Sequence, residues 1–291
     1  MNTTGLYDPA YEHDACGVAF VARLDGTASH ETVARALTAV ANLEHRGAAG
    51  ADALTGDGAG IIVRLPDVFF RAVVPGLPPL GSYGVAVCFL PRDERRRGEL
   101  ERLLETTVDE EGQRILAWRD VPVDPAHVGE TAGAVAPRIR QLFVAAASGL
   151  DQDAFDRKLY VIRRRAELGS GGDLVLPTCS SRTVVYKGML SAPQLPGYFP
   201  DLRDPRLESA LALVHSRYST NTFPSWELAH PYRVICHNGE INTVRGNINW
   251  MRARERASCA ASCSARISRR SCPSSGRAIR TRRRSTTCSS C

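Results

Sequence analysis

The sequence has no long apolar run, and this absence removes a membrane-spanning helix from the expected features. No stretch approaches the roughly 20 consecutive apolar residues that a transmembrane helix needs. The first 15 residues contain acids but neither lysine nor arginine, so they do not resemble a secretory signal peptide. The 291 residues are 43% hydrophobic, which is enough for a sizeable core in one large domain or two ordinary ones.

Cysteine is too scattered to indicate a disulfide framework. The chain holds nine cysteines, an odd number, and four of them stand at isolated apolar positions: Cys16, Cys88, Cys179 and Cys236. Secreted disulfide-rich domains instead show an even set of cysteines at short spacings. The pattern therefore predicts free thiols in the reducing cytoplasm.

Acidic residues are missing from one part of the chain, residues 257–291. Of the 37 lysines and arginines, eight are arginines in that tail, so residues 1–256 hold 29 basic and 31 acidic residues. The net charge of +6 thus becomes −2 for the body, and the body gives no indication of a general nucleic-acid surface.

The composition of the tail predicts a disordered segment. Residues 257–291 contain ten serines and five cysteines but almost no aliphatic side chain, so they cannot bury a core. An Arg/Ser nucleic-acid tail and a zinc ribbon are the alternatives, but cysteine gaps of 3, 8, 15 and 2 residues do not form two close pairs. The abrupt change in composition suggests an out-of-frame reading of a GC-rich gene.

Two common ligand-binding motifs are also missing. The glycine-rich stretch 47–60 lacks the lysine of a P-loop and the glycine spacing of a dinucleotide fingerprint. Its five glycines predict close backbone packing, a mobile loop or a hairpin with tight turns. His215, His230 and His237 match no usual zinc spacing, so we expect no metal.

Apolar periodicity predicts a mixed α+β fold in which helices pack on largely antiparallel sheets. Ser29 and Asp93 are placed to cap helices that run through Glu44 and to about Glu111. The arginines and glutamates of the second helix suit a solvated face. Further strands are predicted at 18–22 (buried), 82–90, 115–123, 138–147, 180–187, 210–214 and 234–236, and further helices at 152–168 and 242–255.

Cys16 is the first candidate for chemistry. A free thiol is mostly protonated near neutral pH, so a catalytic cysteine needs a base beside it. If the chain were cut after Ala15, the α-amino group of Cys16 would have a pKa of roughly 7.7 to 8 and could accept the thiol proton. The alternative is that Cys16 is a small core residue that opens a buried strand.

The stretch 215–249 carries the second set of candidates. Arg217 follows an apolar run, so its guanidinium should emerge at a strand end, where it can bind a carboxylate through two hydrogen bonds. Asn238 and Gly239 follow the predicted strand 234–236 and can donate two hydrogen bonds to a developing oxyanion. The alternative is an Asn-Gly turn that joins this strand to the helix at 242–255.

Four stretches together resemble the class II glutamine amidotransferases, most closely those that open the large subunit of glutamate synthases. The resemblance covers about residues 7–256. It implies a four-layer αββα N-terminal-nucleophile sandwich, incomplete at its C-terminus, with residues 1–15 as a propeptide and 16–256 as the amidotransferase domain. The stretches are HDACGVAF (13–20), EHRGAAGADALTGDGAG (44–60), HSRYSTNTFP (215–224) and HNGEINTVRGNINW (237–250).

The resemblance also implies roles for individual residues in the hydrolysis of L-glutamine to glutamate and ammonia. Cys16 resembles the nucleophile, and its freed amine resembles the general base. Arg217 resembles the anchor of the glutamine carboxylate, and Asn238 with Gly239 resembles the oxyanion hole. The loop from Arg46 to about Asp57 resembles a flap that closes over glutamine, with Arg46 as a substrate-binding residue.

The resemblance places the cofactors outside this chain. In such large subunits the ammonia passes to a synthase domain that binds flavin mononucleotide (FMN) and an iron–sulfur cluster, and a small reductase subunit is the implied partner. The family also implies a carboxylate for the substrate ammonium group, in the region where residues 257–291 offer no acid. A truncated, non-catalytic fragment is therefore one alternative, and an amidotransferase domain that serves another acceptor is a second.

Overall fold

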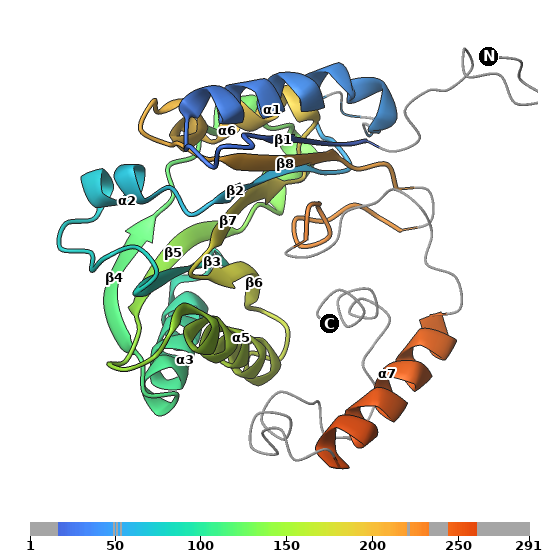
Figure 1. The fold of residues 1–291 in the computed structure, drawn as a ribbon. Coiled ribbons are helices and arrows are strands. Elements are labelled where there is room, and N and C mark those ends of the chain that lie inside the picture. Colours follow the sequence, from blue (N-terminus) through green and yellow to red (C-terminus); the bar gives the residue numbers. More distant parts are fainter. Residues whose placement is uncertain are drawn as a thin grey trace, which may run out of the picture.

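The chain folds as four layers, helices on either side of two packed sheets (Figure 1). The computed structural model describes residues 17–48, 50, 52, 54–219, 222–232 and 244–260. Helices α1 (His30–Asn42) and α6 (Leu195–Tyr198) cover the first sheet, and α3 (Glu94–Glu110) and α5 (Gln152–Gly169) cover the second (Figure 1). The α+β sandwich expected from the sequence is confirmed.

The first sheet joins strands that lie far apart in the sequence. Its order is β1-β8-β2-β7, and every neighbouring pair is antiparallel. In β1, Val18 pairs with His215, so the start of the described chain lies beside the end of β8. The four strands are β1 (Val18–Ala22), β8 (Leu211–Ser216), β2 (Ala59–Arg64) and β7 (Thr183–Gly188).

The prediction that residues 18–22 form a buried strand was wrong about burial. β1 lies at the edge of the sheet, with β8 as its strand neighbour among the described residues. Ala19 and Val21 face the core, whereas Phe20 points away and its side chain is 69% exposed. An edge strand packs on one face, so an apolar run of this length does not by itself indicate burial on both faces.

The second sheet separates the two hydrophobic cores. Alternate residues of β3 point to opposite faces, as a strand requires. Val85 and Val87 enter the larger core, which also holds residues of the first sheet and α1, while Ala86 and Cys88 enter the smaller core with α3 and α5. The order is β4-β5-β3-β6, formed by β4 (Arg114–Asp120), β5 (Arg138–Ala145), β3 (Tyr83–Leu90) and β6 (Val175–Ser180).

The strand predicted at 180–187 is confirmed as β7 from Thr183 onward, but its first residue, Ser180, ends β6, a strand of the other sheet that was not predicted. The chain turns at Ser181 and Arg182, where no glycine, proline, asparagine or aspartate marks the turn. The turn is held from outside instead: the Asp156 carboxylate on α5 accepts hydrogen bonds from the Ser181 amide at 2.8 Å and from Arg182 Nε at 2.9 Å. Pro177 is tolerated in β6 because β6 is an edge strand.

The predicted helix caps at Ser29 and Asp93 are confirmed. Ser29 Oγ accepts from the Glu31 amide at 3.1 Å, and Asp93 Oδ1 accepts from the Arg96 amide at 2.7 Å. Such caps satisfy amides that the first helical turn leaves free. The remaining helices are α2 (Asp67–Val73), α4 (Glu130–Ala134) and α7 (Val244–Ala260).

Helix α7 continues beyond residue 256, where the resemblance was expected to end. Residues 261–291, which include most of the tail, lie outside the described residues. No helix in the described ranges is both long and apolar enough to cross a membrane.

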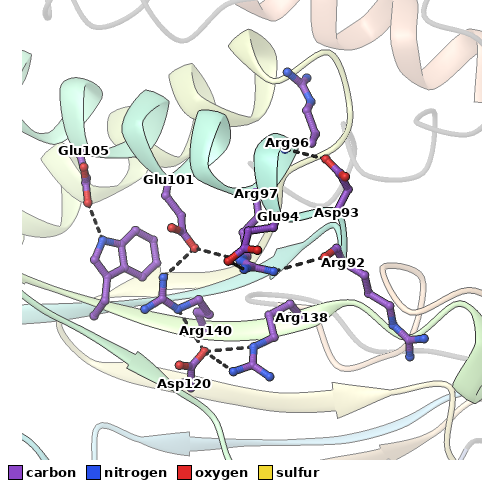
Figure 2. Close-up of polar contacts among 11 residues, drawn as sticks. Arg92, Asp93, Glu94, Arg96, Arg97, Glu101, Glu105, Asp120, Arg138 and Arg140 are labelled. Carbon is purple, nitrogen blue, oxygen red and sulfur yellow. Dashed lines mark hydrogen bonds and ion pairs between the residues drawn. The ribbon is translucent and has the colours of Figure 1, made fainter.

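Charged side chains of α3 bind the outer face of β4 and β5 (Figure 2). Glu101 accepts from Arg140 at 2.6 Å, and Arg140 also lies 3.2 Å from Asp120 on β4. The Arg140 guanidinium stacks over the Trp118 ring, whose nitrogen donates to Glu105 at 2.7 Å. The predicted solvated face is confirmed for Glu94 and Arg95, whereas Glu101 is half-buried and binds β5, so the face is not solvated throughout.

Candidate active site

The end of β8 is the point at which the sequence-predicted stretches meet. The Ser216 amide donates a hydrogen bond of 2.7 Å to the carbonyl of Gly17, the residue that follows Cys16 in the sequence. The next residue, Arg217, donates its own amide to the Gly58 carbonyl at 2.8 Å. Three segments far apart in the sequence are thus hydrogen-bonded to one another where β8 ends and where β1 and β2 begin.

The glycine-rich loop follows α1 and passes beside the end of β8. Arg46 ends a short 3₁₀ turn and is half-buried. A Cβ on Gly47 would lie 2.3 Å from Ser216 Oγ, so a larger residue there would have to displace the Ser216 side chain. The Ala48 amide donates to the Arg217 carbonyl at 3.3 Å. Of the interpretations of stretch 47–60, close backbone packing is confirmed.

The loop is closed by its own backbone and anchored to a neighbouring helix. Within it, the Asp57 amide donates to the Ala48 carbonyl at 2.9 Å. At its tip, the Leu54 carbonyl accepts from the Gly129 amide at 2.8 Å and from Gln194 Nε2 at 2.8 Å. The described part of the predicted flap is therefore held at both its base and its tip.

Arg217 emerges directly after β8, as predicted, but its side chain lies inward and is only 9% exposed. Nη1 donates to the Asp57 carbonyl at 3.2 Å, and Nη2 donates to Thr222 Oγ1 at 2.8 Å. Burial lowers the pKa of Arg217 from its usual value. A buried guanidinium attracts an anion strongly, because little water screens its charge. Binding of the glutamine carboxylate by Arg217 stays a prediction.

Asp57 and Thr222 lie in predicted stretches, but sequence reasoning gave neither of them a role of its own. The Asp57 carboxylate accepts from the Ser219 amide at 2.7 Å, and burial raises its pKa. Through these contacts the loop and the segment after β8 hold each other. The available signal was weak, because Asp57 reads as one more turn residue between two glycines.

Cys16, Asn238 and Gly239 lie outside the described residues, as does the strand predicted at 234–236. Their roles therefore stay predictions. The described chain reaches Gly17 on one side of the site and Tyr232 on the other.

The comparison with protein families gives a match over most of the chain. A sequence model described as "Glutamine amidotransferases class-II" matches residues 16–271. The chain belongs to this family. The match of the class II amidotransferases begins at Cys16 and extends beyond residue 256, so the domain boundary predicted there stays a prediction.

Curated members of the amidotransferase family give more specific similarities. "Glutamate synthase [NADPH] large chain" of Bacillus subtilis (strain 168) is 48% identical over 257 residues, which cover 86% of this chain and 17% of that protein. The large chain of Azospirillum brasilense is 44% identical, with 88% and 17% covered. "Ferredoxin-dependent glutamate synthase 1, chloroplastic/mitochondrial" of Arabidopsis thaliana is 42% identical, with 86% and 16% covered. The chain thus spans about 17% of the length of the first two relatives.

A buried lysine beside the amidotransferase site also escaped sequence reasoning. Lys187 in β7 is 2% exposed, and Nζ donates to the backbone carbonyls of Glu227 at 3.1 Å and Ala229 at 2.6 Å. Its ammonium lies 4.6 Å from the centre of the Tyr232 ring. In the described ranges, no three His, Cys, Asp or Glu side chains form a group that could hold a metal ion.

Proposed function

We propose that this chain carries out the glutaminase half-reaction of glutamate synthase. The single observation that carries the proposal is the meeting of Gly17, the loop after Arg46 and Arg217 at the end of β8. Cys16 directly precedes Gly17 in the chain, so its thiol would lie near the Arg217 guanidinium and the loop after Arg46. Membership of the class II amidotransferases and the names of the relatives support the same reaction.

In the proposed reaction the Cys16 thiolate attacks the side-chain amide carbon of L-glutamine. Asn238 and Gly239 donate hydrogen bonds to the oxyanion, and the Cys16 α-amino group moves the proton from the thiol to the leaving nitrogen. The C–N bond breaks and ammonia leaves. Water then hydrolyses the thioester to glutamate. Arg217 and Arg46 hold the substrate.

The proposal includes removal of residues 1–15, since the amine of Cys16 can act as a base only when it is free. The family match, which starts at residue 16, supports this cut. The ammonia would be used by a synthase domain outside this chain. FMN, the iron–sulfur cluster and the contact with a small subunit would belong to the longer cytoplasmic enzyme.

The test combines the N-terminal sequence and intact mass of the purified protein with ammonia release from L-glutamine. We expect a chain that begins at Cys16 and a Cys16→Ala variant without glutamine-dependent ammonia release. Cys179→Ala is the matched control, because Cys179 is a buried cysteine of the smaller core, which lies on the other face of the second sheet from the site. A chain that keeps Met1 and releases no ammonia would instead support a non-catalytic fragment.

A further inference from the structure

Lys187 and His215 lie in one row across the first sheet. In the register, Lys187 pairs with Gly60 on β2, Gly60 pairs with His215 on β8, and His215 pairs with Val18 on β1. Paired residues of neighbouring strands point to the same face. The row therefore carries a lysine and a histidine on one face, separated by a residue without a side chain, and it ends beside the start of β1.

The backbone of segment 222–232 fills the space above Gly60. A Cβ on Gly60 would lie 2.4 Å from the His230 carbonyl oxygen and 2.6 Å from Lys187 Cβ. The segment thus lies directly on the sheet between the lysine and His215. Its buried carbonyls need donors, and the Lys187 ammonium supplies two of those hydrogen bonds.

Aromatic rings pack against His230 on both sides. The His215 and His230 rings meet edge to face with centroids 4.6 Å apart, and the His230 and Tyr232 centroids are 4.3 Å apart. The Tyr232 ring in turn covers the ammonium of Lys187. Cation, rings and carbonyls therefore form one connected group, buried except for the half-buried Tyr232, which we call the lysine–histidine assembly (Lys187, His215, His230 and Tyr232).

Charges on three elements act on this lysine. Arg163 and Glu167 belong to α5, Glu227 belongs to segment 222–232, and Arg217 follows β8. Burial is the main reason that the pKa of Lys187 falls to about 7, and Arg163 lowers it further. The chain has only two lysines, Lys158 and Lys187, among its 37 lysines and arginines. The compact ammonium fits here, where a planar guanidinium would need more room.

We propose that Lys187 is a positioning residue for the amidotransferase reaction. It fixes the path of segment 222–232, which holds Arg217 through Thr222 at one end and leads toward Asn238 and Gly239 at the other. Lys187 does not touch the substrate, and it acts through the backbone that it binds. The inference rests on the proposed function for its catalytic part, but its structural part is independent of activity.

The experiment uses Lys187→Met, which keeps the length of the side chain and removes its charge and donors. Hydrogen exchange of backbone amides in segment 222–232 should become at least about tenfold faster, because buried carbonyl contacts are lost. With L-glutamine, kcat should fall about 10- to 100-fold while KM changes less than about threefold, as expected when catalytic groups are misplaced. Lys158→Met is the matched control. Lys158 lies on α5 and pairs with Glu111 at the end of α3, so this variant should change neither quantity.

Each outcome decides the inference. Unchanged exchange in segment 222–232 overturns it, and so does faster exchange with an unchanged kcat. If the unmutated chain releases no ammonia, the proposed function fails, and exchange alone then decides whether Lys187 holds the segment. Should Lys187→Met not fold, Tyr232→Leu keeps the lysine and removes the ring that covers it. This variant should show smaller changes of exchange and kcat in the same direction, and no change would overturn the inference.

Discussion

The outer face of α3 and the site end of the first sheet both concentrate charge, but they do so in opposite ways. On α3 the ion pairs are mostly exposed and join residues three or four apart, such as Arg95 with Glu99. At the site, Lys187 and Arg217 are buried and bind backbone carbonyls from distant parts of the chain. Exposed pairs are replaceable because water screens them, whereas a buried charge depends on every partner around it.

The largest expected effect is a glycine substitution that has opposite signs in the two regions. Gly60→Ala places a methyl group against the His230 carbonyl and should destabilise the fold by about 3 kcal/mol through overpacking. Gly98→Ala lies within α3, where a Cβ would meet only Arg102 Nη1 at 3.5 Å. It should stabilise the fold by about 0.5 to 1 kcal/mol, because glycine is a poor helix residue.

Urea unfolding of both glycine variants measures this difference. Equal changes in the free energy of unfolding at the two positions would contradict the comparison. A lower kcat of Gly60→Ala under conditions in which the variant is still folded would sharpen the comparison, because Gly60 belongs to the row that carries Lys187.

The second prediction concerns the pH dependence of stability. Burial lowers the pKa of Lys187 from its usual 10.5 to about 7, so the unfolded chain binds more protons between these two pH values. Stability from this group therefore rises with pH in that window, by up to about 1.4 kcal/mol per pH unit, and levels off below about pH 7, where the amine is charged in both the folded and the unfolded chain. On α3, Arg96 lowers the pKa of Glu99 below 4.5, so the contribution of Glu99 is present above that value and is lost in acid.

Urea unfolding from pH 6 to 10 checks this sign. The difference in stability between Lys187→Met and the unmutated chain should vary across the alkaline window, while Lys158→Met should follow the unmutated chain. A constant difference for Lys187→Met would show that the buried amine does not change its charge there.

The smallest effects are expected within the α3 face itself. Arg95 is 89% exposed, and Arg95→Ala should change stability by less than about 0.5 kcal/mol. Glu101 and Arg140 are only 18% and 19% exposed, so Glu101→Ala should cost about 1 kcal/mol. Urea unfolding at low and high salt should show a salt effect on both pairs. Equal losses for the two variants would mean that burial does not rank these pairs.

The elements that sequence patterns predicted well are those whose determinants are local. The caps at Ser29 and Asp93, the strand at 82–90 and the emergence of Arg217 after an apolar run all depend on residues within a few positions of each other. The split at Ser181 was missed because Asp156 on α5 holds the turn from outside. No pattern within the strand itself indicates such a partner.

The candidate site was predictable in its parts and not in its assembly. The motifs around Arg46 and Arg217 were recognised, and the structure brings their neighbours together at Ser216. Lys187 was missed because a polar residue at the end of a strand normally faces water. It is buried because segment 222–232, some 40 residues later, folds back over it. Nothing in the sequence near β7 predicts that contact.

The position of β1 in the first sheet has a consequence for synthesis of the chain. β1 pairs with β8, so the first strand to leave the ribosome has no described strand partner until about 190 residues later. At roughly 5 to 20 residues per second, that delay is on the order of 10 to 40 seconds. Such distant pairing also slows folding, since a long loop must close before β1 and β8 can form their contacts. The nascent chain therefore exposes the segment next to Cys16 until β8 has been made, and this end of the strands is the last part of the sheet to form.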